Sequence, residues 1–284
     1  MDYFLNGILS TENTAIEQNM LRRLALFPQL DRSAKIVLCA YSANSAAYVQ
    51  QQQLSSQVIS CFDWLQEAAD YRGKALRRDD LTLLDNYQRS NVKDGYLYLA
   101  GTHLLARGQV NRHGEITRVT YYDAAEKQLE IDQYDSRGFL SRQQFFDEQQ
   151  RLVGVHYLNP AGQLCLAVSY VEKKPVLYRL VRRQQLFTSQ KDLLQYCLSQ
   201  LLPAAEVVVA ERREYDSLLA AIECQLRVVR LYNAAYQGDE AVADLFLARR
   251  SAQLTNEKTI LLDEYAQHTD LKAQWQQIIT KNIN

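Results

Sequence analysis

Glycine and proline are scarce in this chain. Ten glycines and four prolines among 284 residues amount to about 5%, against about 12% in average proteins. This scarcity argues against a disordered chain and against a protein built around a glycine-rich phosphate loop. The patterns GxGxxG, GxxxxGK[ST] and GxSxG do not occur in the sequence. The usual sequence signs of dinucleotide sites, P-loops and hydrolase nucleophiles are therefore missing.

Long apolar runs and an excess of one charge are missing as well. The best apolar run, Leu164–Val171, has eight residues, far short of the roughly 20 that span a membrane. Residues Met1–Ile8 include Asp2 and no basic segment, so we expect no secretory signal. The formal net charge is −1, which weakens the case for a nucleic-acid partner. We expect a cytoplasmic protein with no nucleic-acid partner and no transmembrane segment.

Cysteine and histidine are too few and too scattered to form a recognisable site. The five cysteines (Cys39, Cys61, Cys165, Cys197 and Cys224) include no CxxC pair, so neither a disulfide framework nor a zinc site is predicted. The four histidines are dispersed. We therefore expect reduced, mostly buried thiols, no metal site and no cofactor.

Strand and helix patterns alternate at both ends of the chain. Lys35–Tyr41 is a continuous apolar strand candidate, and Gln190–Leu202 is an amphipathic helix candidate ended by Pro203. Further helices are expected over residues 61–71, 215–226, 239–254 and 269–279, and a further strand over 259–262. Strands that alternate with helices are typical of βαβ units and a parallel sheet. We predict one discontinuous α/β domain, formed by residues 1–71 and 188–284.

The middle of the chain repeats every 12 residues. Asparagine or aspartate recurs at Asn111, Asp123, Asp135, Asp147 and Asn159, and three residues later come Gly114, Glu126, Gly138, Gln150 and Gly162. Aspartate and asparagine open turns by bonding their own backbone, and glycine closes them where φ is positive. The eight residues left in each period suffice for one strand. We predict an antiparallel meander, inserted as an extended β-sheet domain over residues 72–187, whose turn residues are structural.

The meander is expected to have one dry face and one partly wet face. Polar and apolar residues alternate in Thr117–Tyr122, whereas Leu164–Val171 is apolar on both faces. Two interpretations of the aromatic residues stay open. They could form a binding surface, or they could simply cover the core.

Three stretches carry a resemblance to a known family. The first combines Asn13–Glu17 with Leu21–Phe27, the second is the series of YYD, QYD and FFD turns, and the third is Thr259–Gln267. They resemble GT-B glycosyltransferases that contain an inserted extended β-sheet domain. That family includes the poly(glycerol phosphate) α-glucosyltransferases of wall teichoic acid. It also includes the accessory Sec glycosyltransferase and its stabilising partner. The resemblance implies an α/β fold with a Rossmann-like single lobe of GT-B type.

Comparison with the pattern of this family also shows where the chain departs from these enzymes. The resemblance covers only the first half to two-thirds of a typical member, so the donor-binding lobe is expected to be absent. Ala15 stands where members have glycine, and Tyr232–Tyr236 contains no histidine where members do. No catalytic residue is therefore expected. The acceptor-binding candidates are Thr14, Glu17, Arg212, Asn233 and Tyr236.

Purely structural or solvent-exposed roles for these candidates remain open. Glu17 lies three residues after Thr14, which is the spacing of a helix capping box. Arg212 and Arg213 could be a solvated charge pair rather than a phosphate contact. The residue types alone do not decide between these interpretations.

The functional hypothesis that follows is a non-catalytic, acceptor-binding or stabilising partner in teichoic-acid or surface-adhesin glycosylation. Its partners would be a catalytic glycosyltransferase subunit or a second copy, bound through the meander, and a polymer or protein acceptor. Two alternatives stay open. The chain could be half of a split GT-B glycosyltransferase that is active only with a separate donor lobe, or it could be an inactive truncation.

Overall fold

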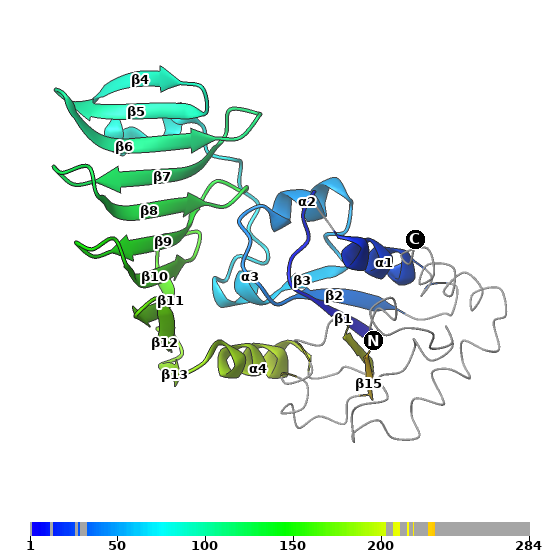
Figure 1. Ribbon diagram of the computed structural model, residues 1–284. Coiled ribbons are helices and arrows are strands. Elements are labelled where there is room, and N and C mark those ends of the chain that lie inside the picture. Colours follow the sequence, from blue (N-terminus) through cyan, green and yellow to red (C-terminus); the bar gives the residue numbers. More distant parts are fainter. Residues whose placement is uncertain are drawn as a thin grey trace, which may run out of the picture. The chain divides into compact units, whose positions relative to one another are not determined.

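The computed structural model describes residues 2–11, 14–25, 28, 33–202, 207–210, 215, 218 and 227–230. It divides into two compact units, whose elements are labelled in Figure 1. Unit 1 comprises Met1–Tyr41, Gln52–Cys61 and Leu194–Asn284, and unit 2 comprises Ser42–Gln51 and Phe62–Leu193. The helices expected at 239–254 and 269–279 and the strand expected at 259–262 lie outside the described residues, as does most of the helix expected at 215–226.

Unit 1 is built on a parallel sheet with the strand order β15-β14-β1-β2-β3. Its strands are β1 (Asp2–Asn6), β2 (Ala34–Leu38), β3 (Val58–Ser60), β14 (Val207–Ala210) and β15 (Arg227–Arg230). Phe4, Leu5 and Ile36 are fully buried. Continuous apolar runs such as these belong to parallel strands that are covered on both faces.

Four α-helices are described. They are α1 (Ala15–Leu24), α2 (Ser45–Gln51), α3 (Cys61–Leu65) and α4 (Gln190–Leu201). The expectation of a helix over residues 61–71 is wrong, because α3 ends at Leu65. Glu67 takes a left-handed φ of 53°, and the Ala68 N–H donates to the Asp63 carbonyl at 2.8 Å. This is a Schellman motif, which stops a helix even without glycine.

Unit 2 is dominated by a ten-stranded antiparallel meander in sequence order from β4 to β13 (Figure 1). Its strands are β4 (Gln88–Val92), β5 (Gly95–Ala100), β6 (His103–Val110), β7 (Ile116–Tyr122), β8 (Gln128–Tyr134), β9 (Leu140–Phe146), β10 (Leu152–Leu158), β11 (Leu164–Val171), β12 (Lys174–Leu180) and β13 (Gln185–Phe187). Two short 3₁₀ helices, η2 (Arg78–Asp80) and η3 (Thr82–Leu84), precede the sheet. Each strand from β6 to β11 occupies one 12-residue period of the sequence.

The five turns between these strands share two hydrogen bonds: the third residue after the asparagine or aspartate donates its N–H to that residue's carbonyl, and the second donates its N–H to that residue's Oδ1. In the first, the Gly114 N–H donates to the Asn111 carbonyl at 3.0 Å, and the His113 and Glu115 N–H groups donate to Asn111 Oδ1. The turns at Asp123 and Asp147 close on Glu126 and Gln150, whose φ values are 58° and 61°. Non-glycine residues rarely adopt this conformation, so the period imposes it even where glycine is absent.

A β-bulge follows every one of these turns. The strand register shifts between Gln109 and Val110 opposite Thr117, and again at the equivalent places of the next four hairpins. The bulged residues are Thr117, Leu129, Ser141, Val153 and Cys165. Bulges increase the twist of a sheet, and the sequence analysis does not anticipate them.

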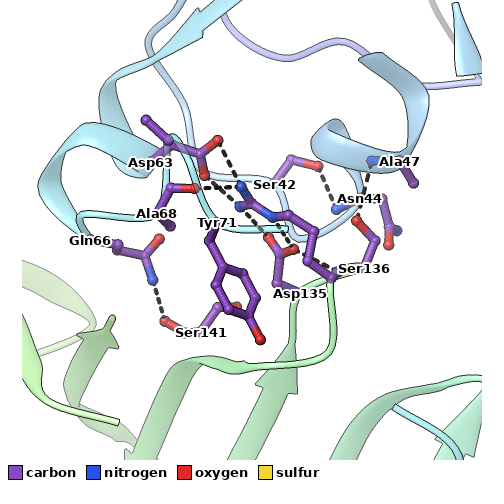
Figure 2. A network of polar contacts seen from close by, with 12 residues as sticks. Ser42, Asn44, Ala47, Asp63, Gln66, Ala68, Tyr71, Asp135, Ser136 and Ser141 are labelled. Carbon is purple, nitrogen blue, oxygen red and sulfur yellow. Dashed lines mark hydrogen bonds and ion pairs between the residues drawn. The ribbon is translucent and has the colours of Figure 1, made fainter. Parts of the chain in front are cut away.

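Unit 2 also contains three segments that are predicted from the sequence to belong to the α/β domain, namely 42–51, 62–71 and 188–193. Hydrogen bonds to the meander explain the placement of the first two (Figure 2). Ser136 donates its N–H to the Ala43 carbonyl and accepts from the Ala47 N–H. The Gln66 side-chain amide donates to the carbonyl of Ser141 at 2.8 Å.

Arg137, in the turn between β8 and β9, ties the same region together. Its guanidinium donates to Asp63 Oδ1 at 2.7 Å, to Asp135 Oδ1 at 2.7 Å and to the Ala68 carbonyl at 2.8 Å. Its side chain is only 11% exposed. Figure 2 shows both carboxylates and the Ala68 carbonyl converging on one guanidinium.

No helix in the described part of the chain is long and apolar enough to cross a membrane.

Candidate functional site

The first predicted site residues, Thr14 and Glu17, form a helix cap at the start of α1. The Glu17 carboxylate accepts from the Thr14 N–H at 2.9 Å and also from the Thr14 hydroxyl. Thr14 is exposed, whereas Glu17 is buried. A cap of this kind satisfies backbone donors that the helix leaves unpaired. An additional acceptor-binding role for Thr14 and Glu17 stays a prediction.

The remaining acceptor-binding candidates, Arg212, Asn233 and Tyr236, lie outside the described residues. Among the residues that are described, no group of three or more histidine, cysteine, aspartate or glutamate side chains could hold a metal ion. The described chemistry is instead concentrated on the two faces of the meander.

The register of the strands assigns side chains to these faces, because residues directly opposite each other point to the same side. One face, here called the carboxyl face, has two rows: Tyr98, Ala106, Tyr121, Glu130, Phe145 and Gly154, and Tyr96, Gly108, Val119, Asp132, Gln143 and His156. The other, here called the arginine face, also has two: Leu97, Arg107, Thr120, Ile131, Gln144 and Val155, and Gly95, Gln109, Arg118, Gln133, Arg142 and Tyr157.

The expectation of one dry and one partly wet face is wrong, because each face is covered over a different part of the sheet. On the carboxyl face, Leu81 and Leu84 from the η2–η3 segment pack in one core cluster with Tyr98, Ala106 and Val119. On the arginine face, Phe62 of α3 packs against Tyr157 of β10, with ring centroids 5.1 Å apart. Each face therefore has its own core and its own more open part.

A polar and aromatic cluster occupies the more open part of the carboxyl face. Gln143 Nε2 donates to Glu130 Oε1 and, at 3.0 Å, to Asp132 Oδ1. Tyr121 also hydrogen-bonds Asp132. The Phe145 ring meets the His156 ring edge-on with a centroid distance of 4.8 Å. We call these residues, Tyr121, Glu130, Asp132, Gln143, Phe145 and His156, the carboxyl cluster.

The surroundings of Glu130 in this cluster favour the protonated form of its carboxyl group. Burial, followed by the hydrogen bond and the charge of Asp132, raises the pKa of Glu130 to about 7, while the bond from Gln143 acts in the opposite direction. Burial likewise raises the pKa of Tyr121, with Asp132 contributing. Burial lowers the pKa of His156 and the nearby Arg179 lowers it further, which keeps the imidazole neutral.

The carboxyl cluster thus combines donors and acceptors beside an aromatic ring. Carboxyl groups, a side-chain amide and a neutral imidazole can all bond hydroxyl groups, and Phe145 offers an apolar face to a ligand. The phenyl ring lies over Gly154. A Cβ atom added to Gly154 would lie 3.7 Å from the ring. This chemistry is suited to binding a hydroxyl-rich ligand.

This cluster is not among the sites predicted from the sequence. Glu130 and Asp132 are two residues apart, which places both on one face of a strand, and that signal was present in the sequence. Gln143 and His156 reach them only through the register between β8, β9 and β10. Because the bulges set that register, spacing along the sequence could not have supplied it.

Comparison with protein families gives one match, to the Accessory Sec system protein ASP-1, over residues 9–181. These residues include elements of both units. No curated protein matches the chain at a significant level.

Solved structures with a similar fold include three protein complexes. The accessory secretory protein 1, 2 and 3 complex of Streptococcus pneumoniae is 16% identical with a TM-score of 0.68, covering 91% of this chain and 56% of that one. The Glycosylation Associate Protein (Gap123) complex of Streptococcus agalactiae is 14% identical with a TM-score of 0.69, covering 95% and 58%. A GtfA/B complex is 12% identical with a TM-score of 0.64, covering 80% and 47%. The chain spans about half the length of these structures, and at such identities the likeness concerns the fold.

Proposed function

Because the chain belongs to the family of the Accessory Sec system protein ASP-1, we propose that it is a non-catalytic partner in protein glycosylation. The match covers 173 residues, from 9 to 181, and so includes most of the meander. This family membership is the observation that supports the proposal. It also agrees with the resemblance to accessory Sec glycosyltransferases and their partners found in the sequence.

The proposal includes a role for each unit. Unit 1 is a Rossmann-like single lobe of GT-B type, and Thr14, Glu17, Arg212, Asn233 and Tyr236 contact the acceptor on it. Unit 2 binds the glycosyltransferase or the acceptor through the carboxyl face of the meander. The protein acts in the cytoplasm on a surface adhesin before export. Each of these roles is proposed from the family membership and is assigned to particular residues of this chain.

The carboxyl cluster supports an acceptor that already bears sugars. Its amide, carboxyl and imidazole groups match the donor and acceptor pattern of sugar hydroxyls. The Phe145 ring is half-buried, so part of it remains available to the apolar face of a sugar.

The experiment is co-purification with the tagged full chain from its native cytoplasm, followed by transfer assays with the recovered glycosyltransferase. We expect a glycosyltransferase to co-purify and the chain alone to transfer no sugar. The double variant Glu130→Gln with Asp132→Asn should reduce retention of a glycosylated acceptor. The matched control is Glu126→Gln. Glu126 lies exposed in a turn, and the equivalent position of another turn is already a glutamine, Gln150.

A second candidate is half of a split GT-B glycosyltransferase. The likeness to the GtfA/B chain over 47% of that chain favours it. Transfer that requires both this chain and a separate donor lobe, with loss of activity after substitution of Glu17 or Arg212, would replace the non-catalytic proposal. Transfer by this chain alone would contradict both candidates.

A further inference from the structure

A ladder of amides and guanidiniums crosses the arginine face. Gln109 on β6, Arg118 on β7, Gln133 on β8 and Arg142 on β9 are direct partners across neighbouring strands. Arg107 lies in the adjacent row on β6. Neighbouring strands are about 4.8 Å apart, so the ladder runs across the strands with amides and guanidiniums in alternation.

The side chains of this face differ in their partners. Arg142 Nη2 donates to Gln144 Oε1 at 3.2 Å, and the Arg142 side chain also hydrogen-bonds Tyr157. Within the described ranges, the side chains of Arg107 and Arg118 have no hydrogen-bond or ion-pair partner. Arg107 Nε and Gln133 Oε1 are buried atoms that likewise lack one among the described residues. Buried polar atoms without partners are costly, so both a donor and an acceptor on this face remain to be satisfied.

The side chains of the ladder lie over the sheet. Thr120 and Ile131, one position along on the same face, are each only 6% exposed. Arg107, Arg118 and Gln133 are half-buried. Long polar side chains commonly cover neighbouring apolar surface while their heads stay accessible. The guanidiniums are therefore held near the sheet surface.

The charge on this face has one sign. The two rows between β5 and β10 contain three arginines and no aspartate or glutamate. The paired carboxyls of the meander lie on the opposite face. The whole chain has a net charge of −1, so this local excess of positive charge is not a property of the overall composition.

We propose that the arginine face binds an extended, acidic polypeptide segment laid across β6–β9. Carboxylates of the segment would accept from the guanidiniums of Arg107 and Arg118, which make strong charge-assisted hydrogen bonds. Backbone N–H groups of the segment would donate to Gln133 Oε1. A polymer of phosphates alone supplies no N–H donor, which favours a polypeptide. The inference goes beyond the proposed function, because it concerns the other face of the sheet.

The test uses the full chain and fluorescently labelled peptides. The probe is a 12-residue peptide of alternating serine and aspartate, compared with the same peptide carrying asparagine for aspartate and with polyphosphate. We expect the wild-type chain to bind the acidic peptide, more weakly as salt rises. Arg118→Glu should weaken that binding by about tenfold or more, since charged hydrogen bonds contribute this much.

Matched variants separate charge from folding. Arg118→Gln removes the charge without reversing it and should give an intermediate loss. Arg112→Glu makes the same reversal at an exposed turn position outside both rows, and binding should stay within about twofold. Circular dichroism checks that all variants keep the wild-type fold.

Three outcomes would overturn the proposal: equal binding of the asparagine peptide, equal losses from Arg112→Glu and Arg118→Glu, or binding of polyphosphate without the peptide. Failure to bind any probe would also overturn it. None of these outcomes bears on co-purification with a glycosyltransferase. The proposed function can therefore fail or succeed independently.

Discussion

At the scale of single residues, Arg137 is a side chain of the meander held by several charged and polar partners at once. One guanidinium serves Asp63, Asp135 and the Ala68 carbonyl. Burial lowers the pKa of Arg137, but the bonds and charges of the two aspartates raise it by more, so the side chain stays charged. Burial of the Asp63 carboxyl group raises the pKa of Asp63, and the charge and hydrogen bond of Arg137 oppose that rise.

Replacing Arg137 should therefore be severe. Arg137→Ala leaves two carboxylates without their shared cation, and breaking a buried pair costs about 3–5 kcal/mol. Chemical denaturation of the full chain measures this loss. Gln149→Ala is the matched control, because Gln149 holds the equivalent place in the exposed turn at Asp147 and should cost under about 0.5 kcal/mol. Equal effects of the two variants would contradict the role given to Arg137.

Glu130 should make stability depend on pH. Its pKa is raised from 4.5 in the unfolded chain to about 7 in the folded one. The folded state thus binds a proton more tightly, and stability present below about pH 4.5 is lost as pH rises through about 7. Glu130→Gln removes this loss. The melting temperature of the variant relative to wild type should be higher at pH 8 than at pH 5.

Glu126→Gln controls for this titration, since Glu126 is exposed in a turn. Its melting temperature should follow that of the wild-type chain at both pH values. If Glu130→Gln followed wild type just as closely, the raised pKa of Glu130 would be refuted.

At the scale of elements, the turns of the meander differ in what surrounds them. Gly138 has a φ of 91°, and an added Cβ would lie 1.8 Å from the Lys74 carbonyl oxygen. Gly162 has a φ of 75°, with nothing within 4 Å of the added atom. Positive φ alone costs a non-glycine residue about 1–2 kcal/mol.

We therefore expect the same substitution to have unequal effects. Gly162→Ala should destabilise by about 1–2 kcal/mol, whereas Gly138→Ala should cost clearly more, because the backbone at Lys74 must move. Urea unfolding of the two variants gives the comparison. Similar losses would mean that the segment at Lys74 adapts freely to the turn.

The sequence predicted the elements better than their contacts. Asparagine or aspartate followed three residues later by glycine is a local pattern, so the positions of the turns could be predicted from it. The partners of Arg137 could not, because Asp63 lies 74 residues away and belongs to a segment expected in the other domain. The carboxyl cluster was missed for a related reason, since its register depends on bulges that leave no clear sequence signal.

At the scale of the whole meander, two separate cores stabilise opposite faces. Leu84 belongs to the core on the carboxyl face, near β5–β7. Phe62 packs against Tyr157 on the arginine face, at β10. Both side chains are buried, at 6% and 7% exposure. Because the sheet lies between the two cores, their side chains share no direct contact through it.

These two cores should contribute independently to stability. Leu84→Ala should cost about 2–5 kcal/mol and Phe62→Ala about 3–5 kcal/mol, and the double variant should match the total within about 0.5 kcal/mol. Denaturation measures the totals, and hydrogen exchange should rise first over β5–β6 for one variant and over β10–β11 for the other. Leu129→Ala, at a side chain 49% exposed, is the control and should change little. If the loss of stability in the double variant differs clearly from the total of the two single losses, the twisted sheet couples its two faces. Binding on one face would then change the stability of the other.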